Sequence, residues 1–404
     1  MADTSTLVYP TGGLGAPKDR SPGAPVDLGL PAGFEVFSAD DHISLADDIW
    51  YEGFPERLRD QAPRVMQVDG GWVLGSNGTT FLPPAFIEVL NQYDPVPGSH
   101  TGDIDARLAA LDAEGVTSEL AFPNAILALL MWPDKEVREL CFRIYNEYLA
   151  GVQERSGGRI WGVGLINWWD AEGAARTLDE LTSLGIRTFL MPLNPGKGDD
   201  GKPLDYASDA MDGVWSAIED SGVPVSHHIG ETTPGIPSQH NTLGVGMLQS
   251  VAPFREVFAK YVLGGILDRH PALQVGWFEG GINWVPSALQ DAEHIAASFA
   301  HLHDHELQHP VQHYWEAHMT ASFMVDPLGL EQIDRIGVTR AMWSSDFPHN
   351  ESTYGYTPEV LASVVAQVGP EAAEAILGDN VRSFLGLGEA AGDGVRDRSP
   401  RDAR

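Results

Sequence analysis

Two hydrophobic patterns alternate along most of the chain. Short, nearly continuous apolar segments predict buried strands, and longer segments with apolar residues at spacings of three and four predict helices that cover them. The strands are expected at Glu35–Ser38, Ser118–Phe122, Ile160–Leu165, Thr188–Pro192, Val223–His228, Gln274–Phe278, Ala317–Ser322 and Ala341–Ser344. The helices are expected at Ala106–Glu114, Lys135–Glu154, Ala171–Leu184, Met211–Asp220, Val251–Arg269, Pro286–Phe299, Leu328–Ile336 and Pro358–Gln367.

Eight alternations of strand and helix favour an α/β fold of the (β/α)8 TIM-barrel type. Gly115, Gly185 and Gly222 lie just past the last turn of three of the predicted helices, where glycine is common. An open, doubly wound sheet is the structural alternative. That fold normally carries a glycine-rich phosphate-binding turn after its first strand, and Ser38-Ala-Asp-Asp-His42 contains no glycine.

The barrel is expected to span residues 34–388, with loose segments at both ends. Residues 1–33 are rich in proline and glycine, and residues 389–404 in glycine, aspartate and arginine, so both are predicted to be extended or disordered. Residues of about 43–101 are too many for an ordinary loop and are predicted to form a lid insertion over the barrel mouth. Its aromatic residues suggest a partly apolar ligand: Trp50, Tyr51, Phe54, Trp72, Phe81, Phe86 and Tyr93.

The charge and cysteine content narrow the classes of partner and site. The chain has 57 acidic and 25 basic residues, for a formal charge of −32, which argues against nucleic-acid binding and anionic membranes. No export or membrane segment is visible, so a cytoplasmic protein is expected. Cys141 is the only cysteine; this excludes an intrachain disulfide and a multi-thiolate metal site, and we expect a buried thiol in a helix.

Carboxylate and imidazole side chains cluster where predicted strands end, which is where barrel enzymes build their sites. Asp40 and His42 follow the first strand and, being two residues apart, can face the same side. The other candidates follow the fifth, sixth and eighth strands: His227 and His228, then Glu279, then Asp346 and His349. A single such residue is often a rim histidine or a helix cap. Their coincidence on one rim instead predicts a site for Zn²⁺, Mn²⁺ or Fe²⁺.

A second group of histidines precedes the seventh strand and points less clearly to a site. It consists of His301, His303, His305, His309 and His313. A solvated helix and loop is the preferred interpretation, although three of these residues would share one helical face. His318 is expected to be packed inside the seventh strand.

These motifs resemble the amidohydrolase-2 family, the decarboxylase-like branch of the amidohydrolase superfamily of metal-dependent TIM barrels. The resemblance covers about residues 35–385. It rests on Asp40-x-His42, Gly222–Gly230, His270–Leu273, Glu279–Pro286, Asp326–Leu330 and, most specifically, Met342–His349. It implies that one divalent ion, with zinc favoured over manganese or iron, is bound by Asp40, His42, His228 and Asp346. His228 is preferred over His227 because it precedes Ile-Gly in the family pattern, and His227 would point away or support the ligands.

Three departures from the family pattern bear on the chemistry. Asp40 stands where much of the superfamily has a histidine, in an acidic variant found in this branch. Glu279 stands near the histidine of the family's decarboxylases. No lysine follows the fourth strand, where Phe189–Pro192 lie, so hydrolases that bridge two metals with a carboxylated lysine are unexpected relatives.

The first functional prediction is a metal-dependent hydrolase that uses a metal-activated water on a small amide, ester or lactone. Asp346 would take the proton of that water. Glu279 would act as general acid or base, or as a ligand of a second ion. His349 would bind a substrate carboxylate, orient Asp346 or bind a second ion. Asn283 and Trp284 are weaker candidates for the pocket lining.

Two other enzyme classes stay open. One is a non-oxidative decarboxylase of an aromatic or unsaturated carboxylic acid, which Glu279 disfavours. The other is a dinuclear iron or manganese hydroxylase that activates oxygen. Enough side chains are present for two ions, namely Asp40, His42, His228, Glu279, Asp346 and His349. A further hypothesis is that the protein is a non-catalytic subunit of a hetero-oligomer with a catalytic paralogue. The expected partners are a small-molecule substrate and other chains in a homo- or hetero-oligomer.

Overall fold

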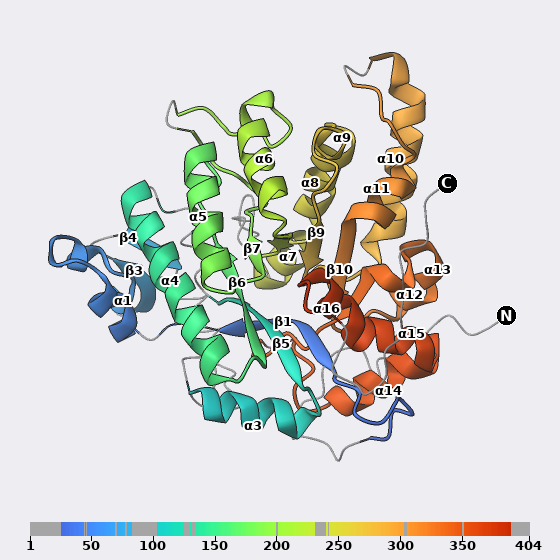
Figure 1. Ribbon diagram of the computed structural model, residues 1–404, viewed down its shortest axis with the longest axis horizontal. Helices are drawn as coiled ribbons and strands as arrows, with labels where there is room; N and C mark the ends of the chain where they lie inside the picture. Colours follow the sequence, from blue (N-terminus) through green and yellow to red (C-terminus); the bar gives the residue numbers. More distant parts are fainter. Residues whose placement is uncertain are drawn as a thin grey trace.

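The structure is a computed structural model (Figure 1). It describes residues 26–388, apart from 44, 46, 69–70, 77–78, 83–102, 125–129, 131, 133, 199–200, 231–239, 241, 303–304 and 350. The predicted N-terminal arm lies mostly outside this part of the chain, and the predicted C-terminal tail lies wholly outside it.

Eight parallel strands form a nearly closed barrel with helices around it, which confirms the predicted TIM-barrel class. The strands are β1 (Phe37–Ile43), β5 (Ser118–Pro123), β6 (Ile160–Leu165), β7 (Thr188–Leu190), β8 (Val225–His228), β9 (Val275–Phe278), β10 (Met319–Phe323) and β11 (Ala341–Trp343). Each pairs in parallel with the next along the chain. The barrel strands are buried almost throughout, as expected for strands with a packed interior on one side and helices on the other.

The first and last strands meet through a different set of hydrogen bonds. The Asp346 amide donates to the Asp40 carbonyl over 2.7 Å, and the His42 amide donates to the Phe347 carbonyl over 2.7 Å. The Ser345 amide donates to the Ser38 hydroxyl over 2.8 Å. The segment that follows β11 is therefore tied to β1 along the residues that carry the candidate chemistry.

The helices alternate with the strands and surround the barrel (Figure 1). They are α1 (Asp47–Gly53), α3 (Ile104–Glu114), α4 (Lys135–Arg155), α5 (Ala171–Ser183), α6 (Asp212–Ser221), α7 (Thr242–Gln249), α8 (Ala252–Val262), α9 (Ile266–Arg269), α10 (Trp284–Phe299), α11 (Val311–His318), α12 (Pro327–Glu331), α13 (Ile333–Ile336), α14 (Thr357–Val368), α15 (Pro370–Glu374) and α16 (Asn380–Phe384). Short 3-10 segments lie at Glu56–Gln61, Asp209–Met211, Ala300–Leu302 and Val338–Arg340, and a π-helical turn lies at Ala375–Asp379.

Several predicted element boundaries were wrong, among them those of two helices and one strand. The single helix predicted over 251–269 is two helices, because the chain turns at Gly264 and at Gly265, which has a φ of 70°. The helix predicted over 328–336 is divided between α12 and α13. His318 is the last residue of α11 rather than part of a strand, but it is buried, and its Nδ1 lies 3.0 Å from the Leu273 carbonyl.

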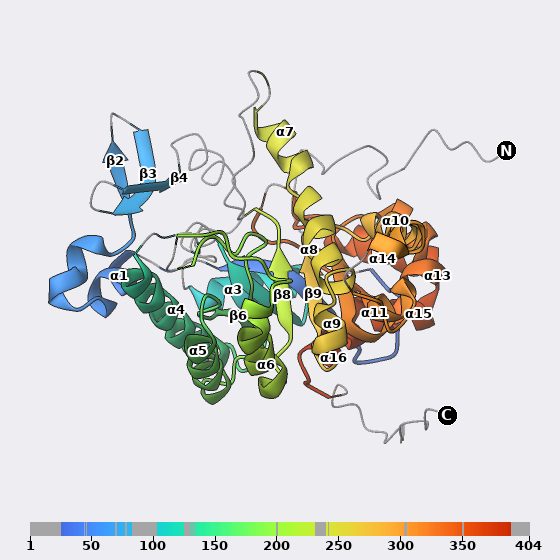
Figure 2. The ribbon, with the colours of Figure 1, turned by 90° about the horizontal axis from the view of Figure 1, so that it is seen from above.

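The segment after β1 contains regular structure in its described part. It forms α1, a 3-10 turn and an antiparallel three-stranded sheet of β2 (Arg64–Val68), β3 (Gly71–Ser76) and β4 (Thr79–Leu82). Trp50 and Phe54 belong to the hydrophobic core, whereas Tyr51 is half exposed. Figure 2 shows this sheet and α7, which follow β1 and β8 respectively, projecting on the same side of the barrel. Phe86 and Tyr93 lie outside the described residues.

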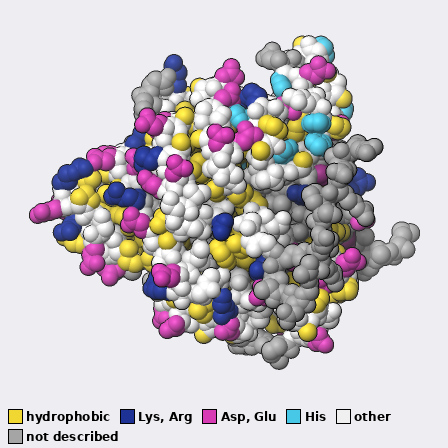
Figure 3. Space-filling view, in the orientation of Figure 1, with side chains coloured by type: hydrophobic (Ala, Val, Ile, Leu, Met, Phe, Trp, Pro, Cys, Tyr) yellow, Lys and Arg dark blue, Asp and Glu magenta, His cyan; other side chains and the backbone are white. Residues whose placement is uncertain are grey.

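The surface carries acidic and basic side chains side by side on the face seen in Figure 3. Histidines gather there near α10 and α11, in the region of the second histidine group. In the part of the chain that the structure describes, no helix combines the length and the apolar character needed to cross a membrane.

Candidate metal centre

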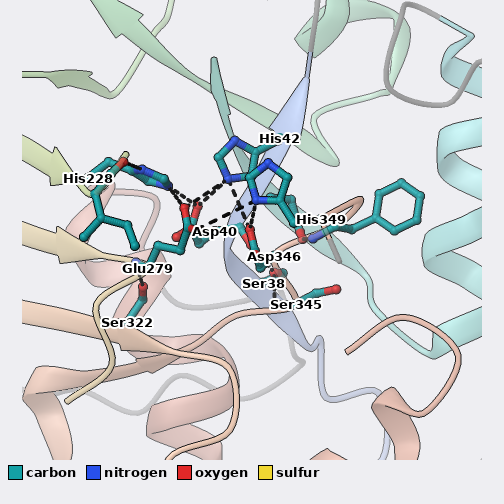
Figure 4. Close-up of polar contacts among 12 residues, drawn as sticks. Ser38, Asp40, His42, His228, Glu279, Ser322, Ser345, Asp346 and His349 are labelled. Atoms are coloured by element: carbon teal, nitrogen blue, oxygen red, sulfur yellow. Dashed lines mark hydrogen bonds and ion pairs between the residues drawn. The ribbon is translucent and has the colours of Figure 1, made fainter. Parts of the chain in front are cut away.

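Six of the predicted side chains meet at the carboxyl ends of four strands (Figure 4). They are Asp40 and His42 on β1, His228 at the end of β8, Glu279 directly after β9, and Asp346 and His349 after β11. The first three and Asp346 are at most 1% exposed, Glu279 is 6% exposed, and His349 is 18% exposed. Chain segments more than 300 residues apart therefore contribute to one buried polar cluster.

One part of the cluster is formed by Asp40, His42 and His228. Asp40 Oδ1 lies 3.7 Å from His42 Nε2 and 3.3 Å from His228 Nε2. Glu279 Oε2 completes this group, at 3.6 Å from His42 Nε2 and 2.8 Å from His228 Nε2. Two carboxylate oxygens and two imidazole nitrogens thus face a common point.

A second, overlapping part contains Asp346 and His349. Asp346 Oδ1 lies 2.9 Å from His349 Nδ1 and 3.2 Å from His42 Nε2. The other oxygen of Glu279, Oε1, is 3.9 Å from His349 Nδ1. The two oxygens of Glu279 therefore face different parts of the cluster, and Figure 4 shows this side chain between His228 and the His42–His349 pair.

The donor atoms fit a metal ion better than they fit one another. Both oxygens of Asp40, both oxygens of Asp346, both ring nitrogens of His42 and His228 Nε2 are buried and make no well-aligned hydrogen bond, although several lie within ion-pair distance of one another. Buried polar groups without partners are costly and rare, so such a concentration indicates a bound group. Ligand bonds of about 2.0–2.2 Å place neighbouring donors about 3.0–3.5 Å apart, close to most of the separations found here.

Two residues of the cluster have strained backbone conformations. Glu279 has a φ of 64° and Asp346 a φ of 60°, and no other residue besides glycine has a positive φ within the described ranges. Such conformations cost about 1–3 kcal/mol each and persist where surrounding contacts fix them. The Glu279 amide donates to Ser322 Oγ over 3.1 Å, and the turn after it is held by Asp326, whose Oδ2 accepts from the Ile282 and Asn283 amides.

Burial and mutual charge shift the pKa values of the cluster. Burial lowers the pKa of His42 to about 4, and raises that of Asp346 to about 6 although the charge of His349 opposes this rise. Burial also acts to lower the pKa of His349, but the Asp346 carboxylate outweighs it and the value is about 10. For His228, the charges of Asp40 and Glu279 outweigh burial, and the pKa lies well above its usual range.

His227 turns away from the cluster, as expected for the neighbour of a strand residue that faces it. Its Nδ1 lies 2.8 Å from the Met191 carbonyl and its Nε2 lies 3.0 Å from the Tyr261 hydroxyl. Its ring stacks on Trp277 with a centroid distance of 5.1 Å. Both nitrogens are thus occupied by the core, and burial lowers the pKa of His227 to about 3.

The weaker candidates have structural contacts. Asn283 Nδ2 donates to Asp326 over 3.0 Å, and Trp284 packs against Trp277. His305 Nε2 lies 2.6 Å from Asp268, in the second histidine group. Among the described residues, the groups with metal-ligand spacing contain none of these side chains.

Two neighbours of the cluster were missed by the sequence interpretation. Phe122 on β5 packs against His228 with a centroid distance of 4.7 Å and against His42 with one of 6.3 Å. Asp41 is completely buried, and its Oδ1 accepts the Phe347 amide over 2.6 Å. An apolar strand residue carries no sequence signal of this kind, whereas an acidic residue between Asp40 and His42 could have been noticed.

A TIM barrel with a buried cluster of histidines and carboxylates at its strand ends defines a class of metal-dependent enzymes. The chain belongs to the amidohydrolase family, whose model matches residues 97–387. No curated protein sequence matches it.

Several solved structures share the fold at low sequence identity. An amidohydrolase from Mycobacterium avium subsp. paratuberculosis superposes with a TM-score of 0.67 and 18% identity, over 88% of this chain and 100% of the other. For 2,6-dihydroxybenzoate decarboxylase from Rhizobium, the TM-score is 0.64 and the sequence identity is 17%, over 87% of this chain and 99% of the other. The structure of 5-carboxyvanillate decarboxylase from Novosphingobium aromaticivorans was solved with manganese and a nitrobenzoic acid derivative. Its TM-score is 0.64 and its sequence identity is 16%, over 88% of this chain and 97% of the other.

Proposed function

We propose that the protein is a metal-dependent hydrolase of a small amide, ester or lactone, and that its centre holds two divalent ions. The observation that carries the two-ion proposal is the position of Glu279, whose two oxygens face the two overlapping donor groups. Asp40, His42 and His228 would hold one ion, Asp346 and His349 the other, and Glu279 would bridge them. Oxygen and imidazole donors of this kind suit zinc, manganese and iron.

A bound divalent ion would lower the pKa of a water molecule toward neutrality and polarise a substrate carbonyl. The chain itself supplies a path for the proton. Asp346 would accept it at the carboxylate oxygen that does not hold the ion, beside His349, which is the most exposed member of the cluster. The buried position of Asp40 and His42 excludes bulk water from the other side.

Oxygen-dependent hydroxylation of a small molecule is the second candidate. It is favoured by the same observation, because two ions held by histidines and carboxylates also suit iron or manganese redox chemistry. Non-oxidative decarboxylation, the reaction named for several proteins of this fold, is supported by the fold and by the use of manganese in some of these structures. The presence of Glu279 within the cluster is the observation against it.

Metal analysis and a substrate panel test this proposal together. Protein purified without chelator, and metal-free protein reloaded with Zn²⁺, Mn²⁺ or Fe²⁺, should contain two ions per chain. Glu279→Gln should retain about one, since it removes the shared carboxylate. Glu114→Gln is the matched control, because Glu114 is also a buried acid but bonds the Gly355 and Thr357 amides.

The reaction class follows from the products. Hydrolysis of esters, lactones or amides at equal rates with and without oxygen is the expected result. Turnover that requires oxygen would replace hydrolysis by hydroxylation, and release of CO₂ from aromatic acids with one ion per chain would replace it by decarboxylation. Failure of the wild-type protein to bind any divalent ion would refute the metal centre itself.

A further inference from the structure

Phe347, directly after Asp346, is fixed on three sides. Its amide donates to Asp41 Oδ1 over 2.6 Å, and its carbonyl accepts the His42 amide over 2.7 Å. The Arg107 guanidinium lies over its ring, 4.5 Å from the centroid. Phe347 is only 2% exposed, so its amide has no access to water if the Asp41 contact is lost.

Asp41 is the member of Asp40-Asp41-His42 that has no place in the cluster. Its neighbours Asp40 and His42 contribute donor atoms, whereas its own carboxylate reaches across to the segment after β11. The completely buried pair of Arg107 and Glu119 interacts electrostatically with it. Asp41 therefore connects β1 to the backbone of the segment after β11, which is the last part of the cluster in the sequence.

The backbone at Asp346 needs such a connection. Its φ of 60° is unfavourable for a residue with a side chain, so the turn relaxes unless neighbouring atoms hold it. The Asp346 amide is bound by the Asp40 carbonyl, and the next amide by Asp41 Oδ1, so that consecutive peptide groups are both fixed to β1. A rotation of this turn would carry Asp346 Oδ1 away from His42 on β1.

We propose that Asp41 is a positioning residue that holds Asp346 in its left-handed conformation and thereby aims the Asp346 carboxylate at the cluster. The required feature is a hydrogen-bond acceptor at Oδ1. This inference rests on the proposed function only in taking the cluster as a metal site. The hydrogen bond itself can be tested in the metal-free protein.

Two variants separate the acceptor from the rest of the side chain. Asp41→Asn keeps a carbonyl oxygen at this position, and Asp41→Ala removes it. In metal-free protein, hydrogen–deuterium exchange of a peptide that contains Phe347 should accelerate at least tenfold in Asp41→Ala and remain near the wild-type rate in Asp41→Asn. Asp41→Ser, which is too short to reach, replaces Asp41→Ala if that variant does not fold.

Cobalt binding provides the second measurement. Asp41→Ala should bind Co²⁺ about 10–100-fold more weakly than the wild type and show an altered visible absorption spectrum, as is typical when a residue that orients a ligand is removed. Asp41→Asn should stay within about threefold of the wild-type affinity. The matched control is Glu114→Ala, which removes another buried carboxylate from amides of the same loop and should leave the Co²⁺ affinity and spectrum unchanged.

The outcomes are distinguishable. Wild-type exchange and wild-type Co²⁺ binding in Asp41→Ala would overturn the positioning role and leave the metal proposal intact. Equal impairment of Asp41→Asn and Asp41→Ala would also overturn it, because an acceptor would then be insufficient. A wild-type protein that binds no Co²⁺ would contradict the metal site, whereas the exchange measurement would still decide whether Asp41 holds the turn.

Discussion

The buried ion pair of Arg107 and Glu119 allows a quantitative prediction for the variant Glu119→Gln. Arg107 on α3 and Glu119 on β5 are completely buried. Arg107 Nε lies 2.8 Å from Glu119 Oε1 and 3.1 Å from Oε2, and Nη2 lies 2.8 Å from Oε2. The substitution keeps the size of the side chain and removes its charge, so the buried guanidinium loses the carboxylate that pairs with it.

The expected cost follows from this burial. Breaking a buried pair by neutralising one partner typically costs about 3–5 kcal/mol, because the remaining charge stays desolvated. Glutamine keeps one oxygen that can accept from Nε or Nη2. Arg107 Nη1 has no hydrogen-bond partner even in the native protein, so no other contact replaces the hydrogen bond that the guanidinium loses. We therefore expect a loss of about 3 kcal/mol in the free energy of unfolding.

Urea unfolding of the metal-free protein, followed by tryptophan fluorescence, measures this loss. Glu180→Gln is the control, because Glu180 lies 3.6 Å from Arg176 in a pair whose side chains are about half exposed, and its loss should be below about 0.5 kcal/mol. Replacing both members, as Arg107→Met with Glu119→Leu, should recover most of the stability. Equal effects of Glu119→Gln and Glu180→Gln would refute the desolvation argument.

Two further predictions concern the histidines. At pH 7 the raised pKa values of His228 and His349 keep both rings protonated in metal-free protein, so loading two ions should release about two protons and the apparent affinity should rise with pH. Calorimetry in buffers of different ionisation enthalpy measures this release, and no buffer dependence would contradict it. His227→Leu should cost about 2–6 kcal/mol, because it leaves Met191 O and Tyr261 Oη without partners. The His227→Leu variant should nevertheless retain metal, whereas His228→Leu should lose it. Loss of metal in His227→Leu but not in His228→Leu would show that His227 is the ligand.

The barrel itself was predictable because its strands are buried on both faces. Segments such as Ile160–Leu165 have no polar side to obscure their pattern, and the observed β6 has the predicted bounds. The first strand was predicted to end at Ser38, yet β1 continues to Ile43. Two aspartates and a histidine looked like the end of a strand, although all three are buried within it.

The gathering of the candidate residues was also predictable, because parallel strands end on one rim. Alternation within a strand implies that only one of His227 and His228 faces the rim, and the family pattern favoured His228. The structure places the two side chains on opposite sides. The contact of Asp41 with Phe347 was not predictable in this way. It joins residues that are 306 positions apart, and its existence depends on the left-handed turn at Asp346 and on how the last strand meets the first.

The seam between β1 and the segment after β11 has a consequence for the order of synthesis. The cluster draws its side chains from positions 40 to 349, so a nascent or truncated chain that ends before Asp346 contains the β1 donors without the residues that complete their surroundings. Under the proposed function, stable metal uptake has to wait until nearly the whole barrel has been made. Retained metal would then indicate a full-length chain with a closed barrel. A prematurely terminated product would be recognisable because it does not retain the metal.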